Sequence, residues 1–268
     1  FTFSAGENIP YPPFQRNPLL WRMKRSVNDA ADGITTTTPL AKRALIHERT
    51  DHKKISVVPN CIDTEQFAPD ENPDAQGLSL PDDFESTTNV LFVHRLCEQK
   101  GVPDLIRAWE SVNYDLTDCR LVLLGENALG DRQRRVVKET DSIIWIEHVP
   151  YQRMPDLYNL CDVGVLPSVS MPNNEEQFGM AVLEAMSCGL PTVVTDVGGL
   201  PFVAQEGETS FVVPERMPSE LAGALRKLLT DAELRERYGE NGRDRACNRF
   251  STARVTDELR GFYEELSG

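Results

Sequence analysis

Short apolar runs alternate with amphipathic stretches along most of the chain. The apolar runs have the length of strands and span residues 90–93, 120–124, 143–147, 162–166, 192–195 and 211–213. Segments with helical spacing fall between most of them, at residues 102–112, 131–140, 154–160 and 177–188. This alternation predicts βαβ units that build a parallel sheet covered on both faces. Three more helices are predicted to follow, at residues 219–229, 231–249 and 251–266.

The first part of the chain has a different pattern. Residues 19–31 have helical spacing, and residues 33–37 and 55–58 have the character of strands. Residues 39–47 predict a helix that Thr38 caps and Pro39 opens. Residues 63–86 are acidic and rich in Pro, and we interpret them as a linker and surface loop. Residues 1–50 are too few to bury a core of their own, so they predict the end of a separate domain.

Composition narrows the class of protein. The 268 residues, 40% hydrophobic and 26% charged, suit one large domain or two small ones. A net charge of −14 argues against nucleic acid as a partner. Six scattered cysteines without a Cys-x-x-Cys pair indicate free thiols in a reducing, cytoplasmic compartment. No apolar run reaches the roughly 18 residues of a membrane-spanning helix. The chain starts at Phe1 rather than Met, so we expect an N-terminally incomplete sequence.

Two cations lie where the first strand of the predicted sheet ends. Arg95 and Lys100 fall in the loop after residues 90–93, and parallel sheets bind ligands beyond the carboxyl ends of their strands. The Arg fork and the Lys point charge both suit a diphosphate, although two solvated surface cations would give the same pattern. Gly125, directly after the next strand, predicts a tight turn that lets a ligand approach.

Two acids accompany the predicted helix at residues 177–188. Glu176 lies at its mouth and Glu184 two turns into it, so their α-carbons would be about 12 Å apart along a continuous helix. Glu184 has apolar neighbours, where a carboxylate needs a hydrogen-bond partner, and the alternative is an ordinary solvent-facing Glu. Phe178 and Gly179 open the helix with backbone N–H groups that an anion can approach.

Motifs for metals and dinucleotides are missing from the sequence. It contains no Asp-x-Asp pair and no Gly-x-Gly-x-x-Gly after a strand, so it supports neither a metal-bound diphosphate nor a dinucleotide cofactor. The four histidines show no metal-ligand spacing. We therefore predict no metal and no cofactor, and we expect His148, just past a strand end, to line a pocket.

A series of short motifs, each weak alone, becomes specific through its order. The series consists of Ala31-Asp32-Gly33-Ile34, Val58-Pro59-Asn60-Cys61-Ile62-Asp63 with Phe67-Ala68-Pro69, Arg95-Leu96 with Lys100-Gly101, Asp156-Leu157-Tyr158, Pro167-Ser168, Glu176-Gln177-Phe178-Gly179, Glu184-Ala185-Met186, Gly189-Leu190-Pro191 and Gly198-Gly199-Leu200-Pro201. Together they resemble the retaining, GT-B-fold glycosyltransferases related to glycogen and sucrose synthases, the group 1 family with a Glu-x7-Glu motif. The resemblance covers about residues 30–213.

The resemblance implies an α/β fold of GT-B type. A Rossmann-like domain with a parallel sheet would bind a nucleotide-sugar donor, and a remnant of the N-terminal acceptor domain would precede it. Arg95 and Lys100 would hold the diphosphate and Glu176 the donor sugar, as the catalytic set. The implied donor-binding residues are Phe178, Gly179, Met180, Glu184, Gly125, His148 and Val149.

The implied reaction is transfer of a hexose from a UDP- or GDP-sugar, with retention of configuration and without a metal. The acceptor would be a glycan, a lipid or a small molecule, and the N-terminal domain would offer a peripheral membrane contact. Five residues depart from the family pattern. Phe202 replaces a frequent Glu after Gly-Gly-x-Pro, and Ser210 replaces a frequent Gly. His94 and Gln177 stand where the family usually has Gly near the phosphate and sugar, and Cys61 replaces Gly at the hinge.

The resemblance also divides the chain. Residues 1–50 would be the acceptor-side remnant, residues 51–88 the hinge and linker, and residues 89–250 the donor-binding domain. Residues 251–268 would form a helix that packs back on the remnant. Two alternatives stay open: a non-catalytic nucleotide-sugar-binding module that needs a partner chain, and an epimerase of similar architecture. The Glu-x7-Glu motif favours the transferase over the epimerase.

Overall fold

The N-terminal part of the computed structural model is a small α/β unit. The model describes residues 18–172 and 175–267. This unit contains α2 (Pro18–Ala30), β1 (Ile34–Thr36), α3 (Pro39–His47), the short 3-10 helix η1 (His52–Lys54) and β2 (Ile55–Val57). β1 and β2 pair in parallel. The Thr38 side chain caps α3 by accepting from the Ala41 N–H at 3.2 Å, as the sequence predicts.

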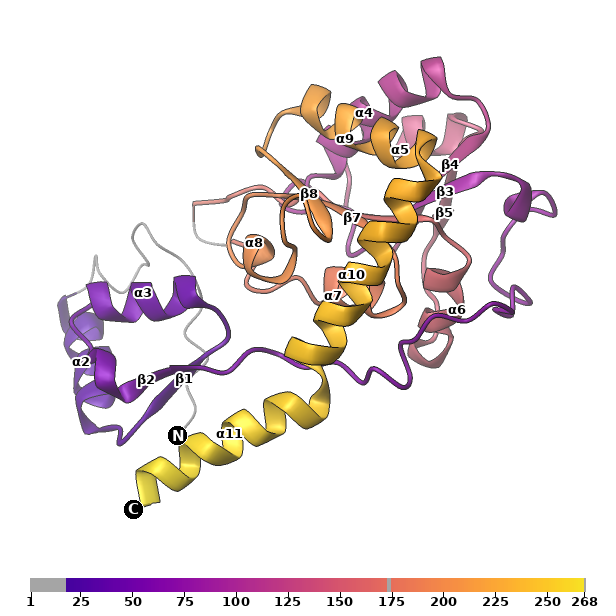
Figure 1. Ribbon diagram of the computed structural model, residues 1–268. Helices are drawn as coiled ribbons and strands as arrows, with labels where there is room; N and C mark the ends of the chain where they lie inside the picture. The colour runs from indigo at the N-terminus through magenta and orange to yellow at the C-terminus, as the bar shows by residue number, and fades with distance from the viewer. Residues whose placement is uncertain (1–17, 173–174, 268) are drawn as a thin grey trace.

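A six-stranded, fully parallel sheet forms the rest of the chain (Figure 1). Its strands are β3 (Thr88–Val93), β4 (Cys119–Leu124), β5 (Ile143–Ile146), β6 (Val163–Leu166), β7 (Thr192–Thr195) and β8 (Ser210–Val213). Their order across the sheet is β5-β4-β3-β6-β7-β8. The chain therefore leaves β3 towards one edge and returns at β6 to build the other half. The β3/β6 boundary is the topological switch point, where such sheets bind ligands.

Helices cover both faces of this sheet, as the alternating sequence pattern predicts. They are α4 (Val102–Asp115), α5 (Asp131–Glu139), α6 (Met154–Asn159), α7 (Met180–Ser187), α8 (Leu200–Val203), α9 (Pro218–Thr230) and α10 (Ala232–Phe250). α4 packs with α9 on one face, whereas α7 packs with α6 and α10 on the other. The α/β class and the parallel sheet predicted from the sequence are confirmed. A helix was expected after the Gly198-Gly199 turn, and α8 confirms it. Its bounds were not predicted, because one turn holding a Pro carries no helical periodicity.

The segment at residues 63–86 is more than the surface loop expected from its composition. It ends in a short 3-10 helix, η2 (Phe84–Ser86). Phe67, Leu78 and Phe84 are buried in the main core. The Phe67 carbonyl accepts from the Ser187 hydroxyl at 2.6 Å and from Arg243 Nη1 at 2.8 Å. The prediction was wrong on this point, because three widely spaced apolar residues do not alter an acidic, Pro-rich average.

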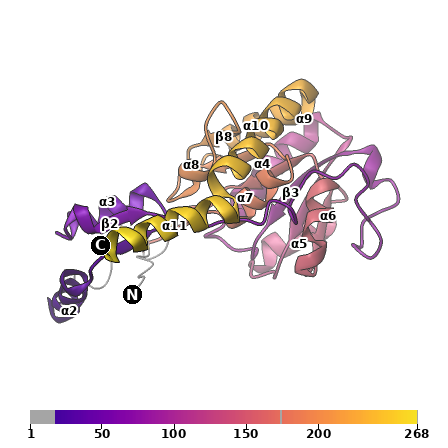
Figure 2. The same ribbon diagram turned by 60° about the horizontal axis from the view of Figure 1, so that its bottom comes forward.

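The last helix, α11 (Thr252–Ser267), returns from the large sheet domain to the N-terminal unit. Figures 1 and 2 both show it running towards β2. Gly33 lies against it, since a Cβ at that position would meet the Phe262 ring at 2.5 Å. At its start, the Ile62 N–H donates to Phe250 at 2.9 Å and the Thr252 N–H donates to Ile62 at 3.0 Å. The segment that leaves the N-terminal unit at Ile62 and the segment that returns to it at Thr252 are therefore hydrogen-bonded to each other. The domain boundaries drawn from the sequence stay a prediction, although β2, in the segment assigned to the hinge, pairs with β1.

Substitutions at two glycines can distinguish the effect of backbone strain from the effect of a steric clash. Gly77 and Gly101 both have left-handed backbones, at φ +79° and +69°. A Cβ on Gly77 would meet nothing within 4 Å, whereas one on Gly101 would lie 1.7 Å from the Pro167 carbonyl oxygen. We expect Gly77→Ala to lower the free energy of unfolding by about 1–2 kcal/mol through strain alone. Gly101→Ala adds a backbone clash, so its loss should exceed about 3 kcal/mol. Urea unfolding followed by circular dichroism measures both, and equal losses would contradict the clash.

Candidate active site

A pocket of about 250 Å³ opens at the switch point of the sheet. His94 lines it from the end of β3 and Leu166 from the end of β6. Residues 176–181, at the start of α7, form another wall, and Asn60 contributes from the hinge. The pocket therefore lies beyond the carboxyl ends of β3 and β6, on the side of the sheet where the sequence predicts a ligand.

An ion pair between Lys100 and Glu176 crosses the switch point. Lys100 Nζ lies 2.6 Å from Glu176 Oε2, and the two side chains are only 10% and 11% exposed. The Ser168 hydroxyl, after β6, donates to the same carboxylate oxygen at 3.1 Å. The structure thus brings together two of the three predicted catalytic residues, which lie 76 positions apart in the sequence.

Backbone contacts fix the loops that carry this pair. The loop after β3 meets the end of β6 where Gly101 lies against the Pro167 carbonyl and where the Val169 N–H donates to Gln99 at 2.8 Å. On the other side, Gly198 lies so close to the Glu176 carbonyl that a Cβ would meet that oxygen at 1.9 Å. Side chains at either glycine would force the loops apart, so the ion pair is held by rigid neighbours.

α7 begins at Met180, three residues later than predicted. Gly179 precedes it in a left-handed conformation with φ +90°, so residues 177–179 cannot continue the helix and Glu176 lies in the loop. The Phe178 side chain is buried and packs edge-on against Phe250 and Phe202. The continuous helix between the two acids was therefore a wrong prediction. The first N–H groups of α7, which no helical carbonyl can accept, belong to residues that line the pocket.

Glu184 lies one turn into α7 and is held by Tyr158 of α6. The Tyr158 hydroxyl donates to Glu184 Oε2 at 2.8 Å, and Tyr158 itself is fully buried. Burial raises the pKa of Glu184, and the hydrogen bond from Tyr158 opposes that shift. This geometry rules out an ordinary solvent-facing Glu. The sequence analysis missed Tyr158 as a partner, although it lies in one of the motifs.

Arg95 is exposed beside the pocket, next to His94. The Arg95 backbone N–H donates to His94 Nδ1 at 2.8 Å. Desolvation, followed by the charge of Lys100, lowers the pKa of His94 to about 4, against the opposing charge of Glu176. His94 is therefore a neutral imidazole at pH 7. It was noted in the sequence only as a departure from the family pattern.

The three remaining predicted residues lie on the β4 and β5 side of the same sheet edge. Gly125 holds the turn after β4 against β3, since a Cβ there would meet the His94 carbonyl oxygen at 2.2 Å. His148 is exposed beyond β5, and Val149 is buried. Among the described residues, no hydrogen bond or ion pair joins His148 or Val149 to the pocket.

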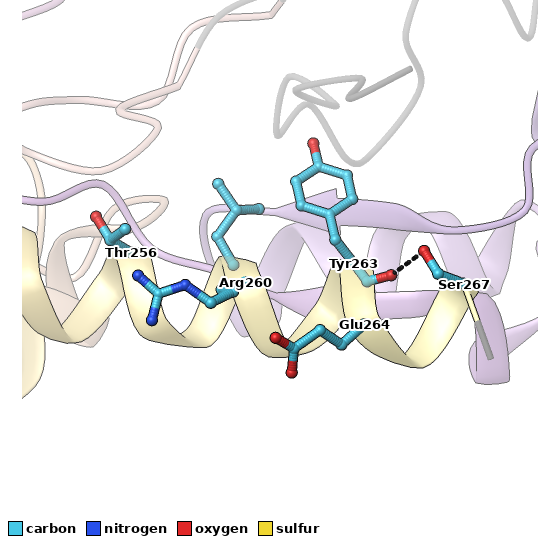
Figure 3. Close-up of a pocket in the computed structure, with 6 residues that line it drawn as sticks. Thr256, Arg260, Tyr263, Glu264 and Ser267 are labelled. Atoms are coloured by element: carbon cyan, nitrogen blue, oxygen red, sulfur yellow. Dashed lines mark hydrogen bonds between the residues drawn. The ribbon is translucent and has the colours of Figure 1, made fainter.

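Three other features were compared with the pocket: metal-binding groups, membrane-spanning helices and a further hollow. In the described part of the chain, no group of three or more His, Cys, Asp and Glu side chains is arranged to hold a metal ion. None of the described helices is long and apolar enough to cross a membrane. A further hollow of about 390 Å³ is lined, among the residues that the structure describes, by α11 alone, including Arg260, Tyr263 and Glu264 (Figure 3). No second described element contributes to that lining, so the described residues do not give it the convergent groups of an active site.

Comparison with known proteins identifies the family. The model of the family described as glycosyl transferases group 1 matches residues 82–245. The chain belongs to this family. A kanosaminyltransferase of Streptomyces kanamyceticus is 31% identical over 66% of this chain and 45% of its own length. An α-maltose-1-phosphate synthase of Mycolicibacterium smegmatis is 27% identical over 91% of this chain and 66% of its own. This group 1 glycosyltransferase chain therefore spans about half to two thirds of the curated relatives it matches.

Solved structures place the group 1 chain in the GT-B fold. Sucrose-phosphate synthase from Thermosynechococcus elongatus has 26% identity and a TM-score of 0.77, with 99% of this chain and 67% of that one aligned. Anabaena HepE in complex with UDP has 19% identity and a TM-score of 0.81, over 98% of this chain and 72% of that one. The fold implied by the sequence motifs is thereby confirmed.

The buried ion pair makes a prediction about stability. Lys100→Met and Glu176→Gln should each lower the free energy of unfolding by about 3–5 kcal/mol, because each leaves a buried group without its partner. The double variant should lose clearly less than the sum of the two. The exposed pair Arg260–Asp257, at 2.9 Å with side chains 64% and 65% exposed, is the control. Its coupling should stay below about 1 kcal/mol. Additive losses at Lys100 and Glu176 would contradict a coupled pair.

Substitution of Glu184, in contrast, is predicted to raise the stability of the fold. A carboxyl whose pKa is raised by folding lowers stability above its ordinary pKa, so stability falls as pH rises through that range. Glu184→Gln keeps an acceptor for Tyr158 and removes the charge. It should therefore raise the free energy of unfolding at pH 7 by on the order of 1 kcal/mol. The gain should shrink as pH falls towards 4, which denaturant unfolding at several pH values measures. Glu139→Gln, at a side chain 71% exposed, should change nothing.

Proposed function

We propose that this chain is the donor-binding part of a retaining glycosyltransferase that uses a nucleoside diphosphate sugar. The observation that carries the proposal is the pocket at the switch point. Glu176 and the start of α7 line it, Lys100 pairs with Glu176, and Arg95 follows the lining residue His94. Glu184 lies one turn further along α7, where Tyr158 holds it. Cations and free N–H groups suit a diphosphate, and fixed carboxylates suit sugar hydroxyls. Membership in a family of glycosyltransferases supports the same conclusion.

Each group then has a role in holding the donor. Arg95 and Lys100 bind the diphosphate together with the backbone N–H groups of Phe178, Gly179 and Met180. Glu176 accepts hydrogen bonds from the hydroxyls of the donor sugar. The ribose hydroxyls lie near Glu184, and the base lies near Gly125, His148 and Val149. HepE, which has a similar fold, was solved in complex with UDP, so uridine is the first base to test.

The proposed reaction needs no metal or other cofactor. The acceptor hydroxyl attacks the anomeric carbon from the face that the diphosphate leaves. The bond from that carbon to the diphosphate oxygen breaks while the bond to the acceptor oxygen forms, and the acceptor proton passes to the departing diphosphate. Arg95, Lys100 and the start of α7 stabilise the charge that develops on the leaving group.

The acceptor side is proposed to lie between α3, the loops after β6 and β7, and α8. A second pocket, of about 580 Å³, opens there. Its polar lining includes Thr38, Ser170 and Asp196, which suit a hydroxyl-bearing glycan, lipid or small molecule. A cytoplasmic location and a peripheral membrane contact stay predictions from the sequence.

A donor-binding module without transfer activity is the second candidate. Incubation of UDP-glucose with an acceptor mixture separates the possibilities. Sugar transfer supports the enzyme, binding without turnover supports the module, and an epimerised donor supports the third alternative.

The diphosphate contact gives a direct test by calorimetry. Arg95→Ala should weaken UDP binding by about 1.5–3 kcal/mol, the range for hydrogen bonds to charged groups, and leave uridine binding unchanged. Glu184→Ala should weaken both ligands, because both carry the ribose. Arg107→Ala is the matched control, since Arg107 is an exposed cation on α4 outside the pocket. Equal losses of UDP and uridine in Arg95→Ala would refute the assignment of the diphosphate.

A further inference from the structure

His94 places an imidazole in the candidate donor pocket. It follows β3 directly and lines the pocket with Glu176 and the start of α7. The family resemblance predicts a glycine here, which would contribute no side chain. The donor contacts proposed above give this ring no role.

One ring nitrogen of His94 is already occupied. The Arg95 backbone N–H donates to Nδ1 at 2.8 Å, so Nδ1 is the acceptor of the imidazole. In a neutral imidazole the other nitrogen then carries the proton. Nε2–H is the remaining polar group of a side chain that lines the pocket, and it is a donor.

Desolvation and the neighbouring cations keep the ring neutral. Desolvation lowers the pKa of His94 most, Lys100 and Arg95 lower it further, and Glu176 opposes them. The other pocket residues, including Asn60, Gln177, Phe178 and Met180, carry no charge. The neutral imidazole of His94 can donate a hydrogen bond without adding a third cation to Arg95 and Lys100.

We propose that His94 donates a hydrogen bond from Nε2 to the diphosphate of the bound donor, alongside Arg95 and Lys100. The inference rests on the proposed function and deepens it. It makes His94 a ligand-contacting residue of this chain and separates its contribution from the two cations.

The contact has a consequence for pH. Desolvation and the cations hold the pKa of His94 at about 4, and the negative charge of a bound diphosphate beside the ring raises that pKa. Binding therefore takes up a proton at pH values between the free and bound pKa. Affinity for the donor should increase as pH falls through that window and stay constant above it.

The test uses UDP-glucose, because the β-phosphate of free UDP titrates near pH 6 and would obscure the profile. His94→Phe keeps an aromatic ring and removes the donor, so its affinity for UDP-glucose should fall about tenfold. His94→Gln can accept from the Arg95 N–H and donate into the pocket, and it should stay within about threefold of the wild type. Uridine binding should change in neither variant.

The pH profile is measured by calorimetry between pH 5.5 and 7.5. Wild-type affinity should rise towards pH 5.5, and both variants should lose the part of that rise that His94 causes. His52→Phe is the control, because His52 is exposed on η1 and outside the pocket. It should reproduce the wild-type profile. Should His94→Phe fail to fold, the Gln profile and affinity decide alone.

The outcomes separate the two proposals. Unchanged UDP-glucose affinity in His94→Phe, with a loss in Arg95→Ala, overturns the role of His94 and leaves the donor site standing. Equal weakening in the Phe and Gln variants also overturns it, since ring shape would then be the cause. A folded wild-type chain that binds neither UDP nor UDP-glucose overturns both.

Discussion

The ion pair between Lys100 and Glu176 is the interaction on which the site depends. Taking two charges out of water is unfavourable, and the pair persists because each end has a close partner and Ser168 adds a further hydrogen bond. Lys100 has three N–H donors, so a diphosphate can bind it without displacing Glu176. A pair of this kind sets the position of both groups before any ligand arrives. In the proposed reaction that preorganisation spares the donor from having to order the two loops.

The pair is useful only because the loops beneath it cannot separate. Close backbone contacts at Gly101 and Gly198 hold the strand ends of both halves of the sheet together. Phe178 anchors the loop from the other side, through Phe250 at 5.8 Å between ring centroids. The Phe250 carbonyl in turn accepts from Ile62, at the crossing to the N-terminal unit. The aromatic cluster that supports the site therefore belongs to the same structure as the hinge. A rotation of the N-terminal unit would act on the site through this contact.

Sequence reasoning recovered the fold because the fold depends on local pattern. The bounds of α3 and β7 were predicted without error, since a Thr-Pro helix start and a β-branched run are strong local signals. The start of α7 was wrong because Gly179 adopts a left-handed backbone, which a helical spacing of apolar residues cannot reveal. The hydrogen-bond partners of Glu176 and Glu184 could not be predicted from local pattern for another reason. Lys100 and Tyr158 lie 76 and 26 positions from them, and only the packed sheet brings them close. The role of each site residue towards a ligand stays a prediction.

An acidic chain that binds an anion must arrange its charges unevenly. The net charge is −14, yet the loop after β3 carries Arg95 and Lys100. The carboxylates gather instead beyond β7 and β8, where Ser170 donates to Glu215 at 2.7 Å and Glu215 donates from its backbone to Asp196 at 3.3 Å. Burial and the charge of Glu215 raise the pKa of Glu175 beside them. The loop after β3 attracts a diphosphate, and the carboxylates beyond β7 and β8 repel it. Neutral sugar hydroxyls can bind on either side. In the proposed function this asymmetry helps to orient the donor, with its phosphates at β3 and its sugar towards the acidic side, where an acceptor hydroxyl would meet it.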